Sequence, residues 1–157
     1  MAYTKEQLEE ANRYEDFAEL VLYMFGIPIG VFRSKEYQIK KGESRGRVEI
    51  KNDKKFKETG NLYIETHEKQ PEATEWVESG ILRKDNSWFW FIGDYDRAWL
   101  FVKKQLRNLV ESKKFKNVET ETSKGVVIPI NYFEQHPDIP IYVFDLEEVS
   151  RHIPSLF

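Results

Sequence analysis

The first apolar pattern in the chain has the period of a helix. Apolar residues recur at spacings of three and four and would share one helix face: Ala11, Tyr14, Ala18, Val21, Leu22 and Phe25. Thr4 followed by Gln7 has the form of a capping box, whereas Gly26 and Pro28 are residues that end helices. The pattern therefore predicts an amphipathic helix from Thr4 to about Phe25.

The next part of the chain has the pattern of β-strands. Residues 30–41, 47–52 and 61–66 are rich in β-branched and aromatic side chains. Residues 42–46 (GESRG) contain glycines that can take a positive φ, so they predict a turn. Because short links join the three segments, we expect a three-stranded meander that packs on the first helix.

The remaining segments alternate between the two periods. Residues 70–80 are expected to form a short helix closed by glycine, and residues 98–111 a second long amphipathic helix. The segment 87–93 (SWFWFIG) is almost entirely apolar, which predicts a central strand buried on both faces. The last expected elements are a charged loop or edge hairpin (113–124), edge strands (126–131 and 141–144) and a helical turn or two (146–152). Pro129 favours an edge because it has no N–H to donate to a ladder.

Together these elements predict an α+β fold, a mixed sheet flanked by helices. A length of 157 residues suits one domain, and the 40% hydrophobic content can fill a core. No internal repeat, low-complexity tract or linker divides the chain. We therefore expect a single domain over residues 1–157.

Composition narrows the functional classes. The chain has no cysteine, which excludes disulfides, a thiol nucleophile and cysteine-bound zinc or iron–sulfur sites. Its beginning is polar and acidic, unlike a secretory signal, and no apolar run approaches the roughly 18–20 residues that span a bilayer. These features lead us to expect a soluble, cytoplasmic protein without membrane partners.

Charge is unevenly distributed along the chain. The formal net charge is −3, yet residues 35–57 hold nine basic and four acidic residues, a local charge of +5. Binding of a polyanion depends on the local field at the contact surface more than on the total charge. Acidic residues within a basic segment suit a metal site that faces phosphate, although a solvated hairpin with ordinary surface lysines has the same composition.

The segment 47–51 (RVEIK) carries the chemistry that suits such a site. In a strand, Glu49 and Lys51 lie on one face and Ile50 on the other. A carboxylate can hold a divalent cation, while a neighbouring ammonium can orient a water or stabilise charge on a phosphate. The alternative is a surface ion pair, which contributes only about 0–1 kcal/mol.

Several segments, taken in order, resemble the PD-(D/E)XK nuclease superfamily, and within it small proteins of phages and bacteria. The resemblance covers most of the chain through segments that are individually unspecific: residues 37–44 (YQIKKGES), 46–53 (GRVEIKND), 59–65 (TGNLYIE), 79–81 (SGI), 88–92 (WFWFI) and, more weakly, 123–129 (SKGVVIP). It implies a restriction-endonuclease-like core of a helix, three strands, a helix and a strand.

The resemblance also implies a site that binds Mg²⁺, or Mn²⁺ in its place. Glu49 and Lys51 would be the acid and the lysine of the (D/E)-X-K element, and the carbonyl of Ile50 a further metal ligand. Gln38 stands where some relatives carry aspartate, so Glu43 is the preferred replacement. Glu65 would complete the site, and Glu19 is an additional candidate ligand from the first helix. The implied contacts to substrate are weaker: Gln38, Arg45, Arg47 and Ser79.

Other motifs add little to this interpretation. The three histidines are too scattered for a zinc motif, and no P-loop, G-x-S-x-G or G-x-G-x-x-G sequence occurs. Strand alternation places Trp88 and Trp90 on one face, which favours core packing over stacking on bases.

Three functions are compatible with these features. The first is a Mg²⁺-dependent DNA endonuclease. The second is a DNA-binding module on the same fold that has lost catalysis, for which Gln38 is the main support. The third is a protein-interaction module that uses its aromatic residues. The sequence leaves the oligomeric state open, a homodimer included, since nucleases that cut both strands often pair.

Overall fold

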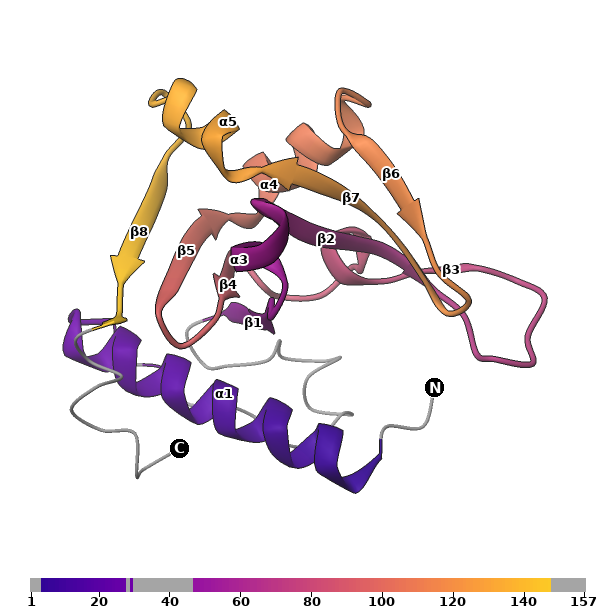
Figure 1. Ribbon diagram of the computed structural model, residues 1–157, viewed down its shortest axis with the longest axis horizontal. Coiled ribbons are helices and arrows are strands. Elements are labelled where there is room, and N and C mark those ends of the chain that lie inside the picture. Colours follow the sequence, from indigo (N-terminus) through magenta and orange to yellow (C-terminus); the bar gives the residue numbers. More distant parts are fainter. Residues whose placement is uncertain (1–3, 28, 30–46, 148–157) are drawn as a thin grey trace. The chain divides into compact units, whose positions relative to one another are not determined.

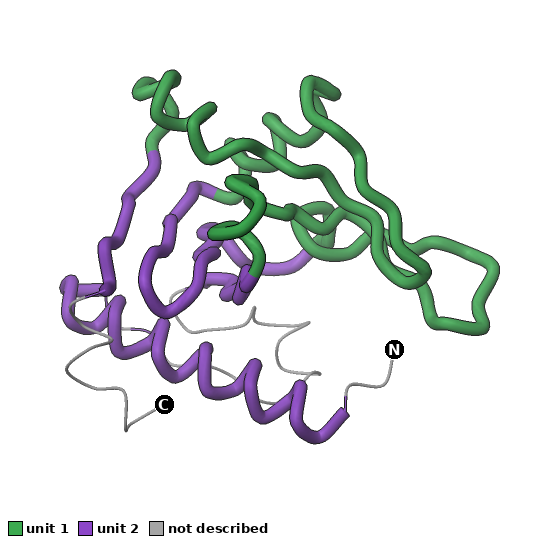
Figure 2. The backbone as a smooth tube through the Cα atoms, viewed as in Figure 1, with its two compact units in different colours: residues 1–2, 55–84, 103–140 green, residues 3–54, 85–102, 141–157 purple. Residues whose placement is uncertain are grey.

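The structure, a computed structural model, describes residues 4–27, 29 and 47–147 and divides into two compact units (Figures 1 and 2). Unit 1 contains Lys55–Lys84 and Lys103–Pro140, and unit 2 contains Tyr3–Lys54, Asp85–Val102 and the chain from Ile141. Each unit has its own four-stranded sheet. The protein is therefore α+β, with a mixed sheet and helices.

Unit 2 begins with the expected helix, α1 (Lys5–Met24). The capping box is formed: the Gln7 N–H donates to Thr4 Oγ1 at 3.2 Å, and the Thr4 N–H donates to Gln7 Oε1 at 3.0 Å. The helix stops at Gly26, whose φ of +81° is a left-handed conformation that glycine adopts without a Cβ clash. The sequence prediction for this helix is confirmed.

The sheet of unit 2 has the strand order β1-β4-β5-β8. Its strands are β1 (Val48–Asn52), β4 (Phe89–Gly93), β5 (Arg97–Val102) and β8 (Ile141–Asp145). β1 runs parallel to β4, and the other pairs are antiparallel, so this sheet is mixed. The predicted strands at 47–52, 87–93 and 141–144 are confirmed, with β4 in the buried centre and β8 at the edge.

One face of this sheet packs on α1 (Figure 1). The buried helix residues Tyr14, Phe17 and Val21 form a core with apolar side chains of the strands: Val48, Ile50, Phe91, Ala98 and Phe144. Because successive strand residues alternate, the other face of β1 carries Glu49 and Lys51. This alternation places the candidate site on the face opposite α1.

Unit 1 is built on an antiparallel sheet of order β3-β2-β7-β6. Its strands are β2 (Asn61–Glu68), β3 (Val77–Glu78), β6 (Lys116–Glu119) and β7 (Ser123–Pro129). The helical elements of this unit are α3 (Phe56–Thr59), η1 (Gly80–Leu82), α4 (Lys103–Glu111) and α5 (Ile130–Gln135). β2 alternates cleanly, with Leu62 and Ile64 buried and Tyr63 and Glu65 on the half-exposed face.

Several sequence predictions for these segments are wrong. The helix expected at 70–80 is not formed: Val77–Glu78 is a strand that pairs with His67 and Glu68, and Gly80 begins the short η1. The expected helix at 98–111 exists only as α4, because residues 97–102 pair with β4 and β8 as β5. β7 lies between β2 and β6, so it is not an edge strand, and Pro129 only ends it.

The expected meander is also wrong for the two of its strands that the structure describes, β1 and β2. β1 and β2 follow each other in the chain but belong to different sheets, so they are not neighbouring strands. The hairpin expected near 113–124 is formed by β6 and β7. The strand at 30–41 and the turn at 42–46 lie outside the described residues, as does most of the segment 146–152. In the part of the chain that the structure describes, no helix has the length and apolar character of a membrane span.

Candidate functional site

The centre of the candidate site is an ion pair on β1. The Nζ atom of Lys51 lies 3.3 Å from Oε1 of Glu49, as expected for residues two positions apart on one strand face. The Glu49 side chain is 0% exposed, whereas the Lys51 side chain is 33% exposed. The carboxylate is therefore buried beside an ammonium that still reaches solvent.

Trp90 of β4 lies beside this pair. It is in register with Glu49, so both side chains project from the same face of the sheet. The ammonium of Lys51 lies 5.6 Å from the centre of the Trp90 ring, within the range of a cation–π contact. The Trp90 N–H is buried and has no acceptor among the described residues. One face of the sheet thus carries a hydrogen-bond acceptor (Glu49), a cation (Lys51) and a hydrogen-bond donor (Trp90).

Arg47, which directly precedes this strand, has an unusual conformation. Its φ of +57° lies in the left-handed region, and its carbonyl accepts the N–H groups of Trp88 (2.7 Å) and Phe89 (3.1 Å). The guanidinium carbon lies 4.7 Å from the centre of the Trp88 ring. Trp88 is 61% exposed, so the expectation that it packs in the core with Trp90 is wrong. The guanidinium of Arg47, a candidate contact to substrate, therefore lies over an exposed indole ring.

Glu65 lies in unit 1, at the centre of a separate hydrogen-bonded group. Ser79 donates to its Oε2 at 3.1 Å, and Ser123 donates to its Oε1 at 3.0 Å. The hydroxyl of Tyr63 lies 2.5 Å from that of Ser123. Burial raises the pKa of Tyr63, the Glu65 charge adds to this, and the Ser123 hydrogen bond opposes it. Both oxygens of Glu65 are therefore engaged by hydroxyl groups that join β2 to β7 and to η1.

Ser79 and Gly80 fix this group through the backbone. Ser79 precedes η1, is 3% exposed and directs its hydroxyl to Glu65 instead of capping the turn. Gly80 has a φ of +51°, and a Cβ there would overlap the Glu65 carbonyl. The buried hydroxyl of Ser79 has the geometry of a support for Glu65, not of a surface contact to phosphate.

The predicted ligands are only partly described. Glu49 and Ile50 lie together on β1, and Glu19 is half-exposed on α1 of the same unit. Gln38, Glu43 and Arg45 lie outside the described residues, and Glu65 belongs to unit 1. Within residues 4–27, 29 and 47–147, no three acidic or histidine side chains gather as a metal-binding group. The convergence of Glu43, Glu49 and Glu65 remains a prediction.

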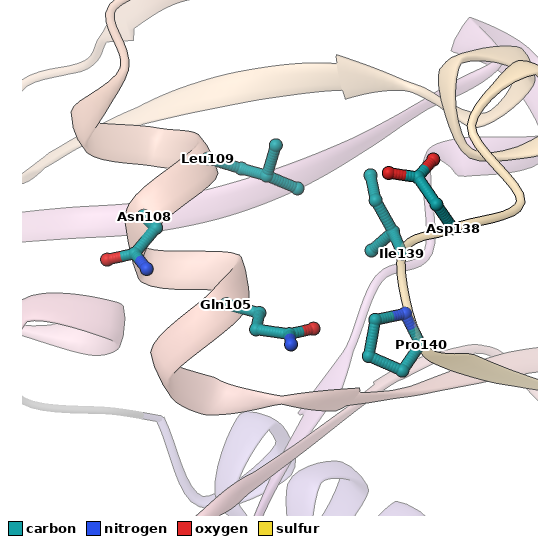
Figure 3. Close-up of a pocket in the computed structure, with 6 residues that line it drawn as sticks. All are labelled: Gln105, Asn108, Leu109, Asp138, Ile139 and Pro140. Carbon is teal, nitrogen blue, oxygen red and sulfur yellow. The ribbon is translucent and has the colours of Figure 1, made fainter.

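The remaining features include one surface hollow in unit 1, between α4 and the segment before β8 (Figure 3). Its volume is about 250 Å³, below the roughly 300–1,000 Å³ of usual small-molecule sites. Figure 3 shows Gln105 and Leu109, one helical turn apart, pointing toward Ile139 and Pro140. The hollow has neither the depth nor a cluster of charged groups that would suit the proposed chemistry.

The sequence interpretation missed the partners of the candidate residues. Alternation along the expected strand 87–93 places Trp88 in the core, but the strand begins at Phe89, so Trp88 lies before it and is exposed. Ser123 was not singled out, because its link to Glu65 spans 58 residues and leaves no local signal. Comparison of the chain with protein-family models, with curated proteins and with solved structures gives no match.

Proposed function

We propose that the protein is a Mg²⁺-dependent phosphodiester hydrolase acting on DNA, with Glu49 and Lys51 at its centre. The proposal includes a restriction-endonuclease-like core in which β1 carries the (D/E)-X-K element, and a cytoplasmic place of action. The observation that carries it is the fully buried Glu49 carboxylate with the Lys51 ammonium 3.3 Å away.

Stability gives little reason for such a pair. Taking the Glu49 carboxylate out of water costs several kcal/mol, and its attraction to Lys51 roughly offsets that cost. Apolar side chains of similar size would stabilise the strand equally well. A buried carboxylate paired with a partly exposed ammonium, beside a buried indole N–H, is instead the kind of arrangement that functional sites retain.

Two of the described residues would supply part of the proposed magnesium site. Mg²⁺ is usually held by one or two carboxylates, with waters and substrate phosphates completing its shell. Glu49 and the Ile50 carbonyl fit this requirement, and Glu43 is the proposed second carboxylate. When bound, the cation would polarise the phosphate and lower the pKa of a bound water. Glu65 keeps its proposed role only if it exchanges a serine partner for the cation.

Lys51 has the geometry for the second role. Its ammonium is paired with Glu49 yet one-third exposed, so it can turn between the carboxylate and an incoming phosphate or water. There it would hold the attacking water or counter the negative charge that develops on the phosphate. Burial of Glu49 means that part of the surrounding chain must move aside before a cation and substrate reach its carboxylate.

Cleavage of plasmid and short labelled DNA with Mg²⁺ or Mn²⁺ tests this proposal. Glu49→Gln keeps the shape of the side chain, and we expect it to lower cleavage by at least about 100-fold. Glu9→Gln, at an exposed position of α1, is the matched control and should cleave as wild type does. Equal cleavage by Glu49→Gln and wild type would reject the assignment. Light scattering on the same preparations determines whether the protein is a homodimer, a state that the sequence leaves open.

The second candidate is a DNA-binding module without catalysis. It is favoured by the close pairing of Glu49 with Lys51, since the ammonium already neutralises the carboxylate that would hold the cation. Such a protein would bind DNA with a steep dependence on salt and would not cleave it. Calorimetric binding of Mn²⁺ that is lost in Glu49→Gln would decide against this candidate.

A further inference from the structure

The exposed side of unit 2 carries a second feature next to the ion pair. Of its three tryptophans, Trp90 and Trp99 are each 1% exposed, whereas Trp88 is 61% exposed. A single exposed aromatic side chain is common on protein surfaces. Trp88 differs because a charged group is fixed on its ring by the backbone.

The fixing group is Arg47. A non-glycine residue in the left-handed region costs about 1–2 kcal/mol, and its φ is +57°. Two hydrogen bonds from the N–H groups of Trp88 and Phe89 to its carbonyl hold this conformation. From this backbone position the guanidinium lies over the indole, 4.7 Å from the ring centre. Backbone strain of this kind is kept where it positions a functional side chain.

We infer that Arg47 and Trp88 form a platform on which an unpaired base of single-stranded DNA stacks. The guanidinium lies over one face of the indole, so a base of any kind would stack on the other face, while the guanidinium pairs with the adjoining phosphate. Bases within a duplex are already stacked on their neighbours, so this platform selects a single strand or a frayed end. The inference rests on the proposed action on DNA and names the form of DNA that the site accepts.

Charge supports a nucleic acid as the occupant. Arg47 directly precedes β1, and Lys51 is the fourth residue of that strand. The acidic residue between them, Glu49, is 0% exposed and paired with Lys51. The exposed groups along this line are therefore basic and aromatic, which is the combination that follows a single-stranded backbone.

Fluorescence anisotropy with a labelled 12-nucleotide oligothymidine and a 12-base-pair duplex tests this inference. All titrations contain EDTA, so that no cleavage interferes. We expect wild type to bind the single strand more tightly and Trp88→Ala to weaken that binding about 5- to 150-fold, the range for one lost stacked base. Trp88→Phe should retain most of the affinity. Arg47→Ala should also lower the slope of log affinity against log salt by about 0.7.

Two controls separate this site from general surface effects. Tyr23→Ala removes another exposed aromatic ring (68% exposed), and Lys5→Ala removes another charge, both from α1. Both should bind as wild type does. Unchanged binding by Trp88→Ala, equal affinity for duplex and single strand, or absence of binding would overturn the inference. Binding as expected without cleavage in Mg²⁺ would reject the proposed hydrolase and leave the platform standing. Cleavage by wild type together with unchanged binding by Trp88→Ala would support the hydrolase and reject the platform.

Discussion

Replacing Lys51 by methionine removes one ammonium and keeps the length of the side chain. The Glu49 carboxylate would then be buried without the cation that lies 3.3 Å from it. Because Glu49 is 0% exposed, water cannot take the place of that cation while the strand keeps its packing. We therefore expect Lys51→Met to lower the free energy of unfolding substantially.

The size of the effect follows from distance and burial. At an effective dielectric constant of about 20, two unit charges 3.3 Å apart attract each other by about 5 kcal/mol. Mutations that break a buried pair by removing one partner cost about 3–5 kcal/mol. Since one-third of the Lys51 side chain is exposed, the lower end of that range, about 3 kcal/mol, is the expected loss.

The reverse change should cost much less. Glu49→Leu leaves Lys51 without its carboxylate, but the exposed ammonium can turn to solvent. In the double variant, both charges are replaced by apolar groups, and such replacements are often neutral or stabilising. The double-mutant cycle should therefore give a coupling energy of about 3 kcal/mol between the two positions.

Urea unfolding followed by circular dichroism measures all four proteins. The matched control is the exposed pair of Lys5 and Glu9 on α1, 3.9 Å apart, for which the same cycle should give less than about 0.5 kcal/mol. A coupling energy for the β1 pair as small as that of the control would refute the reasoning. So would a larger loss for Glu49→Leu than for Lys51→Met.

Three further predictions concern other parts of the structure. Burial, with nearby negative charges, raises the pKa of Tyr14 well above 10.0. Its contribution to stability is therefore present below pH 10.0 and lost as the pH rises further. In urea unfolding, Tyr14→Phe should show a smaller decrease in the free energy of unfolding at alkaline pH than wild type. Ser79→Ala leaves one oxygen of the half-buried Glu65 without its donor and should cost about 1–2 kcal/mol in the same assay. Gly60→Ala should cost about 1 kcal/mol because of its positive φ. Gly80→Ala should cost more, because Gly80 also has a positive φ and its Cβ would overlap the Glu65 backbone. Equal losses for the two variants would contradict this overlap.

The sequence predicts those elements whose signals are local. The capping box of α1 and its apolar face lie within one helix, and the pairing of Glu49 with Lys51 needs only the period of a strand. The prediction of helix for residues 98–102 is wrong because their apolar residues fit both periods. Their pairing with β4 and β8 decides the outcome. A turn signal was present, since Asp94 Oδ1 accepts the N–H groups of Asp96 and Arg97 before the strand.

In the candidate site, too, only the features with local sequence signals are predictable. The Glu49–Lys51 pair was found, whereas its complete burial depends on packing that no local pattern contains. The serine partners of Glu65 come from positions 14 and 58 residues away, so only the folded chain brings them together. The platform at Trp88 was missed for a related reason: alternation along a strand says nothing of residues that lie before the strand begins.

The central claim is that the Glu49 carboxylate binds a divalent cation. Crystals soaked in Mn²⁺ and measured for anomalous scattering test it most directly, with crystals of Glu49→Gln as the control. We predict an anomalous peak at metal–oxygen bonding distance from the Glu49 carboxylate, with Lys51 turned away from it, and no peak in Glu49→Gln. A soaked crystal in which Glu49 stays paired with Lys51 and no peak lies beside it would contradict the claim.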